Sequence, residues 1–225
     1  MNQISSLQIT FIIAVTPKVL LEDLPALQEL TILWECDYFD CTRAIGQSIS
    51  QLPSTLRSFS VTDWFIFSSE RLSSFNPVWA HLINVELAIY LLNVSRLLRL
   101  CLNLSSCNIV LYEPFTYADF QFPEPFTHAN LRSLRIICSP WRRSNPLPKL
   151  FIALTLPNLR VLEAQSYGII QWPHEEFKEL LARSHCPLER LICNHPVMAS
   201  NEQHRAEYIA LIPSLQVDFT FHPGF

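Results

Sequence analysis

Histidine and cysteine are the residues of this chain best able to do chemistry, and there are seven of each. Their closest grouping is His185, Cys186, Cys193 and His195, whose spacing resembles a metal-ligand set. Both cysteines of that grouping fall inside an apolar phrase, where a thiol resembles a core residue. We therefore interpret the four residues as structural positions and expect no metal ion and no other cofactor.

Motifs for catalysis are missing from the sequence. It contains no GxSxG, HExxH, GxGxxG or Walker motif and no paired CxxC. Three glycines against 16 prolines argue against glycine-rich phosphate loops. We predict that the protein is not an enzyme. The 16 basic and 20 acidic residues are mixed along the chain, which lacks the one-sided positive field that nucleic acid requires.

The cysteines and the first residues predict where the chain resides. Cys107, Cys138 and Cys193 sit beside strand-like segments, and an odd set of cysteines without CxxC pairs favours reduced, buried thiols. This predicts an intracellular protein, cytoplasmic or nuclear. The apolar stretch from Leu7 to Val15 is shorter than the roughly 20 residues of a membrane span, so we predict a strand there, no membrane partner and no signal peptide.

A repeat organises the chain. A leucine-led apolar phrase occurs eight times, and in the first seven of them further apolar residues follow the leucine at offsets of three and five. Successive lead residues are 22 to 29 residues apart, close to the range of about 20 to 29 residues for leucine-rich repeats. The lead residues are Leu27, Leu56, Leu82, Leu104, Leu131, Leu159, Leu188 and Leu215.

The repeat predicts an α/β fold, a leucine-rich-repeat-like solenoid in one domain over residues 1–225. A curved parallel sheet forms its concave side, and helices or irregular segments form its convex side. One helix is predicted from Pro173 to Arg183, with an apolar face that includes Phe177 and Leu180. Another follows Asn201, with three residues turned inward: Ala206, Ile209 and Ala210. Shorter helices are predicted over residues 17–24 and 148–156.

Strand alternation turns every second residue of each phrase outward, which predicts a ladder of small, polar and charged side chains. Such a ladder suits recognition of a protein or peptide, and a merely solvated sheet face would have the same composition. Both interpretations stay open. The ladder consists of Glu29, Thr31, Ser58, Ser60, Asn84, Glu86, Ser106, Asn108, Ser133, Arg135, Val161, Glu163, Arg190 and Ile192.

Two further segments could bind a partner. Trp141, Arg142 and Arg143 are residue types that dominate interface hot spots, and the alternative is a solvated corner. Trp64, Phe65 and Phe67 follow the second repeat strand. We interpret that apolar run as core or convex packing rather than as an exposed anchor.

Several phrases together resemble the C-terminal repeat region of the F-box proteins of mushroom-forming fungi. They are LLRLCLNLSSCNI, EPFTHANLRSLRI, LTLPNLRVLEA, WPHEEFKELLARSHCPLERLI and AEYIALIPSLQV. In that family an N-terminal F-box docks onto the Skp adaptor of a cullin-type ubiquitin ligase, and the repeats hold the substrate. No LPxEIL-like F-box phrase precedes Leu7 here. Skp binding is therefore expected only if a missing N-terminus supplies an F-box.

The resemblance implies a substrate-recognition solenoid that presents its concave sheet and nearby loops to a protein partner. The alternative is a free-standing interaction scaffold without a ubiquitin ligase role. The sequence upstream of Met1 discriminates between the two, since an in-frame F-box favours the first.

Overall fold

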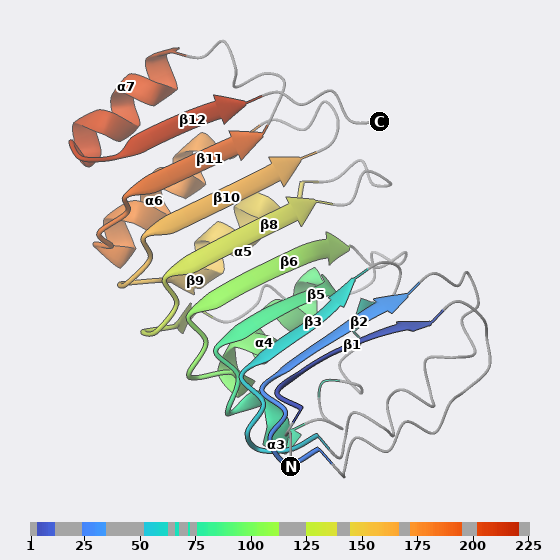
Figure 1. Cartoon of the computed structure of the whole chain (residues 1–225). Coiled ribbons are helices and arrows are strands. Elements are labelled where there is room, and N and C mark those ends of the chain that lie inside the picture. Colours follow the sequence, from blue (N-terminus) through green and yellow to red (C-terminus); the bar gives the residue numbers. More distant parts are fainter. Residues whose placement is uncertain are drawn as a thin grey trace. The chain divides into compact units, whose positions relative to one another are not determined.

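The computed structural model describes residues 4–11, 24–34, 52–62, 66–67, 72, 76–112, 125–138, 145–166, 172–194 and 202–220. Contacts divide the chain into two compact units, Met1–Leu104 and Ser105–Phe225. Both units combine parallel strands with helices (Figure 1). Within the described ranges, no helix is long and apolar enough to cross a membrane. The single domain over residues 1–225 stays a prediction.

The first unit is a parallel sheet in the order β1, β2, β3 and β5, with β4 beside β5. Its strands are β1 (Ser6–Phe11), β2 (Glu29–Trp34), β3 (Ser58–Thr62), β4 (Ile66–Phe67) and β5 (Asn84–Tyr90). Its helices are α3 (Asn76–Trp79) and α4 (Leu91–Leu100). The strand predicted at the start of the chain is confirmed as β1.

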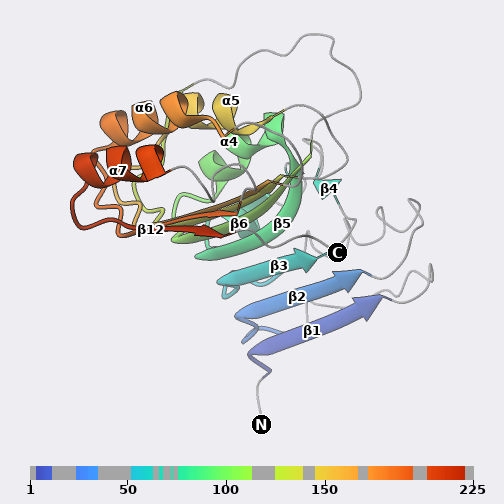
Figure 2. The same cartoon turned by 90° about the horizontal axis from the view of Figure 1, so that it is seen from above.

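The second unit is a parallel sheet in the order β6, β8, β10, β11 and β12. Helices α5, α6 and α7 lie on one face of it (Figure 2). Its strands are β6 (Ser106–Tyr112), β8 (Ser133–Cys138), β10 (Val161–Ser166), β11 (Arg190–Asn194) and β12 (Gln216–Thr220), with a separate pair of β7 (Phe126–Thr127) and β9 (Leu154–Thr155). Its helices are α5 (Leu147–Ala153), α6 (His174–Ser184) and α7 (Glu202–Leu211).

The repeat phrase makes the core. All eight lead leucines are at most 5% exposed, and so are both inner strand residues of the first seven phrases, from Leu30 and Ile32 to Leu191 and Cys193. Alternation along a strand sends these residues to one face and their neighbours to the other. Because consecutive phrases pair in parallel and in chain order within each unit, the predicted α/β solenoid-like arrangement is confirmed there.

The corner before each strand is held by the same hydrogen bonds in successive repeats. The backbone N–H of the lead leucine donates to the carbonyl three residues earlier, as from Leu27 to Leu24 (3.0 Å) and from Leu159 to Leu156 (3.2 Å). The carbonyl after the lead leucine then accepts two N–H groups of the next repeat, as Arg132 O does from Arg160 (2.8 Å) and Val161 (3.0 Å). These bonds satisfy the corner's backbone groups and fix the strand register.

One corner uses a side chain instead. His128 is 2% exposed, and its Nδ1 accepts the backbone N–H of Leu131 at 3.1 Å. We expect His128→Ala to lower the free energy of unfolding by about 2 kcal/mol, because the Leu131 N–H loses its buried acceptor. Urea denaturation measures this change. His128→Asn offers a carbonyl oxygen at a similar place, so an equal loss for both variants would contradict the acceptor role.

Hydrogen bonds connect the C-terminal end of α6 to the preceding repeat. Arg183 Nη2 donates to the carbonyls of Phe151 (2.6 Å) and Leu154 (2.7 Å) at the end of α5. Ser184 is buried, and its Oγ accepts the backbone N–H of Leu156 at 3.0 Å. A cation at a helix C-terminus is favourable for the helix dipole, so the Arg183 contacts stabilise the end of α5 and couple it to α6. The Ser184 contact ties α6 to the segment that follows β9.

The helix predictions have mixed outcomes. The helix predicted from Pro173 to Arg183 is α6, and its inward residues, including Phe177, Leu180 and Leu181, are confirmed as buried. The helix predicted over residues 148–156 is shorter, because it ends at Ala153 and β9 begins. The residues before Leu24 in the helix predicted over 17–24 lie outside the described ranges.

The inward face predicted for the helix after Asn201 is wrong. Ala206, Ile209 and Ala210 of α7 are exposed, and Tyr208 is buried instead. The larger aromatic ring of Tyr208 lies inward because it packs against the ring of Phe177, with ring centroids 5.1 Å apart. A helix with alanine and isoleucine on one side offered a plausible apolar face by periodicity alone.

Candidate binding face

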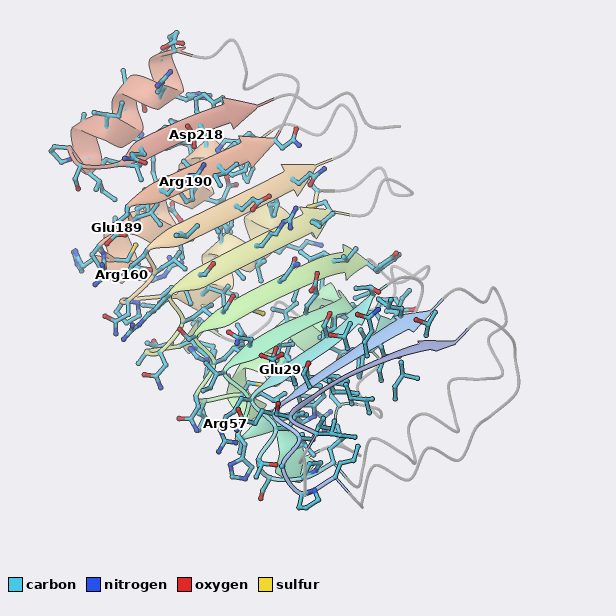
Figure 3. The ribbon with its side chains drawn as sticks, in the orientation of Figure 1. Glu29, Arg57, Arg160, Glu189, Arg190 and Asp218 are labelled. Atoms are coloured by element: carbon cyan, nitrogen blue, oxygen red, sulfur yellow. The ribbon has the colours of Figure 1, made fainter. Side chains whose placement is uncertain are left out.

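In each unit, the outer face consists of the strand residues that alternate with the buried ones. The predicted ladder residues of each unit lie on its outer face, and each is exposed or half-buried. Glu29, Asn84, Arg135 and Arg190 are the most accessible of them by class. The face therefore presents side chains of small size, neutral polarity and both charges, and Figure 3 shows several of its charged members.

Strand register arranges the outer face in rows. In the first unit Glu29 is opposite Ser58, and Ser58 is opposite Asn84. One row further along the strands, Thr31, Ser60 and Glu86 face one another. Ser60 donates a hydrogen bond to Glu86 Oε2 at 3.0 Å. This part of the face offers hydroxyl donors and carboxylate acceptors.

Three ion pairs link the strands on the outer side of the second unit. Arg135 Nε lies 3.0 Å from Glu163 Oε1, and Arg190 Nη2 lies 3.0 Å from Asp218 Oδ2. Arg160, just before β10, pairs with Glu189, just before β11. Ion pairs this exposed contribute less than about 1 kcal/mol each to stability, so a partner's polar groups could replace them at little cost.

Metal and thiol chemistry receive no support from the described part of the chain. It contains no group of three or more His, Cys, Asp or Glu residues placed to hold a metal ion. Cys186 and Cys193 are buried, free thiols, and His195 lies outside the described ranges. Burial raises the pKa of Cys107 to about 12 and raises that of Cys193 well above its ordinary value. A thiol held protonated in this way is a poor nucleophile and a poor ligand.

A polar cluster joins α6 to α7. His174 Nε2 lies 2.9 Å from Glu207 Oε2, and His174 Nδ1 lies 2.7 Å from the Tyr208 hydroxyl. The indole N–H of Trp172 donates to that hydroxyl at 2.8 Å. The His174 ring stacks on His204, with ring centroids 3.8 Å apart.

The direction of two of these bonds follows from the atoms involved. The Glu207 carboxylate only accepts, so His174 Nε2 donates to it, and the Tyr208 oxygen accepts from the Trp172 indole N–H. In the tautomer with its single proton on Nε2, His174 Nδ1 accepts from the Tyr208 hydroxyl. This sequence resembles an acid, histidine and hydroxyl relay. Tyr208 is however 0% exposed, and burial raises its pKa, so its hydroxyl is neither accessible nor nucleophilic. The cluster is a structural lock between two helices.

This lock is expected to weaken in mild acid. Burial and the neighbouring His174 lower the pKa of His204 below its ordinary value of 6.5. Glu175 and Lys178 of α6 and Glu207 of α7 also act on that ring. The folded state therefore binds fewer protons than the unfolded chain as pH falls through about 6.5, and stability is lost with falling pH.

The measurement is amide hydrogen exchange of α7, expressed as protection factors at two pH values on either side of 6.5. Protection is expected to fall at the lower pH in the natural protein and to change less in His204→Gln. Equal protection at both pH values would contradict the lock. A second loss is expected at lower pH, because hydrogen bonds from His174, Lys178 and Gln203 lower the pKa of Glu207 from 4.5 to about 2.

Other predicted site residues have different outcomes. Trp141, Arg142 and Arg143 lie outside the described ranges, as do Trp64 and Phe65. Phe67 is 0% exposed, so its predicted packing role is confirmed.

Sequence reasoning missed the charged corner residues Arg132, Arg160 and Glu189. They directly follow the lead leucines Leu131, Leu159 and Leu188. That position was outside the alternation rule used for the strand ladder. A recurring charged residue directly after the lead leucine was the signal that could have found them.

Comparisons with known proteins add little to this geometry. No family model matches the chain, and no curated protein matches it. A solved structure, the leucine-rich repeat-containing protein LegL7 from Legionella pneumophila, is similar at 13% sequence identity and a TM-score of 0.43, with 96% of this chain and 82% of that chain covered. A likeness this distant carries no argument about binding, so the fold rests on the strand pairing described above. The resemblance to fungal F-box proteins stays a prediction.

Proposed function

We propose that this protein is an interaction scaffold that binds a protein partner through the outer face of its parallel strands. One observation carries the proposal: all the predicted ladder residues of both units are accessible on the side of the strands opposite the buried core. A sheet that exposes fixed rows of side chains on rigid strands is a preorganised binding surface. The ion pairs of Arg135 and Arg190 on it are exposed and weak.

Binding, rather than catalysis, is the function that this geometry supports. The one relay of an acid, a histidine and a hydroxyl among the described residues is closed off by the burial of Tyr208. The buried cysteines Cys101, Cys107, Cys138, Cys186 and Cys193 carry free thiols. Free thiols fit a reducing compartment, and we propose an intracellular location on that ground.

The test is to capture partners with the full chain, purify the one that co-enriches, and titrate it against matched serine-to-lysine variants. Ser58→Lys and Ser133→Lys place a long charged side chain on the outer face of one unit each. Ser95→Lys, on α4, is the matched control. We expect one of the outer-face variants to weaken binding about tenfold or more, with the control unchanged. Loss only in the control would remove the proposal.

A finer version of the proposal is substrate recognition for a Skp-cullin-F-box ubiquitin ligase, and it rests on the resemblance of the repeat phrases alone. Its test is co-purification of the full-length transcript product with the Skp adaptor. Capture of Skp together with an in-frame F-box upstream of Met1 supports it. An upstream region without an F-box leaves the scaffold free-standing.

A further inference from the structure

The three ion pairs between the strands of the second unit follow a rule. Each of their arginines pairs with an acid on the next strand or at the corner before that strand. Arg135 of β8 pairs with Glu163 of β10, Arg160 pairs with Glu189, and Arg190 of β11 pairs with Asp218 of β12. Sequence separations of 28 or 29 residues within these pairs match one repeat.

Arg132 departs from this rule. It occupies the corner before β8, one repeat ahead of Arg160, and its side chain is exposed. The Arg160 N–H donates to Arg132 O at 2.8 Å, so the two residues are direct neighbours across the strands. In the three ion pairs the partner in the next repeat is an acid, whereas the neighbour of Arg132 in the next repeat is a second arginine, Arg160. Among the described residues, the Arg132 guanidinium has no ion pair or side-chain hydrogen bond.

The neighbour of Arg132 on its other side, Ser105, is neutral. Its backbone N–H and that of Ser133 donate to Ser105 O at 2.9 and 3.0 Å, which places the corner of β6 beside it. Arg57, at the same repeat position in the first unit, differs because its Nη1 donates to Ser54 O (2.7 Å) and Leu56 O (3.0 Å). Arg132 therefore has guanidinium N–H donors that make no hydrogen bond to the described residues, and its neighbour Arg160 carries the same charge.

We propose that Arg132 and Arg160 form a carboxylate-binding site for an acidic segment of the protein partner. Like charges opposite each other on neighbouring strands are unfavourable, and a carboxylate beside both guanidinium groups relieves that repulsion. Arginine binds carboxylates through two parallel N–H groups, which fixes the orientation of the ligand. The inference deepens the proposed function and rests on it, because it names the chemistry of the partner at one place on the outer side of the sheet.

The surroundings favour an acidic peptide over nucleic acid. Two acids lie close to the two arginines: Glu163 on β10 and Glu189 at the corner before β11. A phosphate backbone, with a charge at every nucleotide, would meet these carboxylates along its path, whereas one acidic side chain would not. The formal net charge of the whole chain is -4.

The experiment measures binding of a dye-labelled octapeptide with one glutamate among seven glutamines to the full chain by fluorescence anisotropy at low ionic strength, with octaglutamine as the neutral peptide. We expect the glutamate-containing peptide to bind and octaglutamine not to bind. Arg132→Gln is expected to weaken binding of the glutamate-containing peptide about fivefold, and Arg132→Lys less, because lysine keeps the charge without the fork. Glu189→Gln is expected to tighten it about threefold, since it frees the Arg160 guanidinium.

Arg205→Gln is the matched control, because Arg205 is an exposed arginine on α7 with only a 4.0 Å contact to Glu202. All these residues are exposed, so circular dichroism is expected to show folded variants. Unchanged binding in Arg132→Gln, equal binding of octaglutamine, or tighter binding of a single-stranded oligonucleotide would overturn the inference. If those results came while Ser58→Lys or Ser133→Lys still abolished capture of the purified partner, the carboxylate site would fail and the scaffold would stand.

Discussion

Phe177→Ala is expected to lower the free energy of unfolding of the second unit by about 4 kcal/mol. Phe177 is 0% exposed on α6. Its ring lies 5.6 Å from that of Phe151, 5.7 Å from that of Trp172 and 5.1 Å from that of Tyr208. Removing it leaves a cavity among three aromatic rings on three successive segments, and the rings also lose favourable edge contacts.

Urea denaturation with an intrinsic fluorescence readout measures this loss, and amide exchange shows where it occurs. Protection is expected to fall in α5, α6 and α7 together, because their packing shares the Phe177 ring. Glu179→Ala, on the exposed side of the same helix, is the control and is expected to change stability by less than about 0.5 kcal/mol. A similar loss of stability in both variants would contradict the role of ring packing in this layer.

Phe59→Ala is expected to cost about as much in the first unit, about 4 kcal/mol. Phe59 is one of the two inner residues of β3 and is 1% exposed. Its ring meets those of Phe67 (6.3 Å) and Trp79 (5.9 Å) edge to face. The indole of Trp79 is fixed by its own hydrogen bond to Leu72 O at 2.9 Å, so the surrounding rings cannot easily collapse into the space.

The matched control is Ser58→Ala, one residue earlier on the outer face of the same strand. It removes a half-buried hydroxyl and is expected to leave the midpoint of urea denaturation nearly unchanged. Amide exchange in β3 and β5 is expected to rise in Phe59→Ala, since these strands pair through Phe59 and Val85. A stable Phe59→Ala variant would contradict the assignment of this position to the core.

The parts of the fold that the sequence predicted are those governed by local alternation. A leucine with apolar residues three and five positions later admits one arrangement on a strand, so Leu134 and Ile136 were assignable to the inner face. The neighbours Ser133 and Arg135 were then assignable to the outer face. The binding of the partner there stays a prediction.

The parts that the sequence did not predict depend on contacts between repeats. Tyr208, and not Ile209, lies on the inward face of α7 because its ring packs against Phe177 of α6 and its hydroxyl accepts the indole N–H of Trp172. Neither contact is visible in the periodicity of α7. Likewise, the like-charge neighbours Arg132 and Arg160 are 28 residues apart in the sequence, and only the strand register brings them together.

Photo-cross-linking tests the central claim most directly. A benzophenone amino acid placed at Ser106, Ser133 or Glu163 samples the outer face, and the same residue at Ile152 or Glu179 samples exposed helix positions. Irradiation of the full chain with its purified partner is predicted to give covalent adducts from the strand positions and none from the helix positions. Adducts from the helix positions alone would contradict the account.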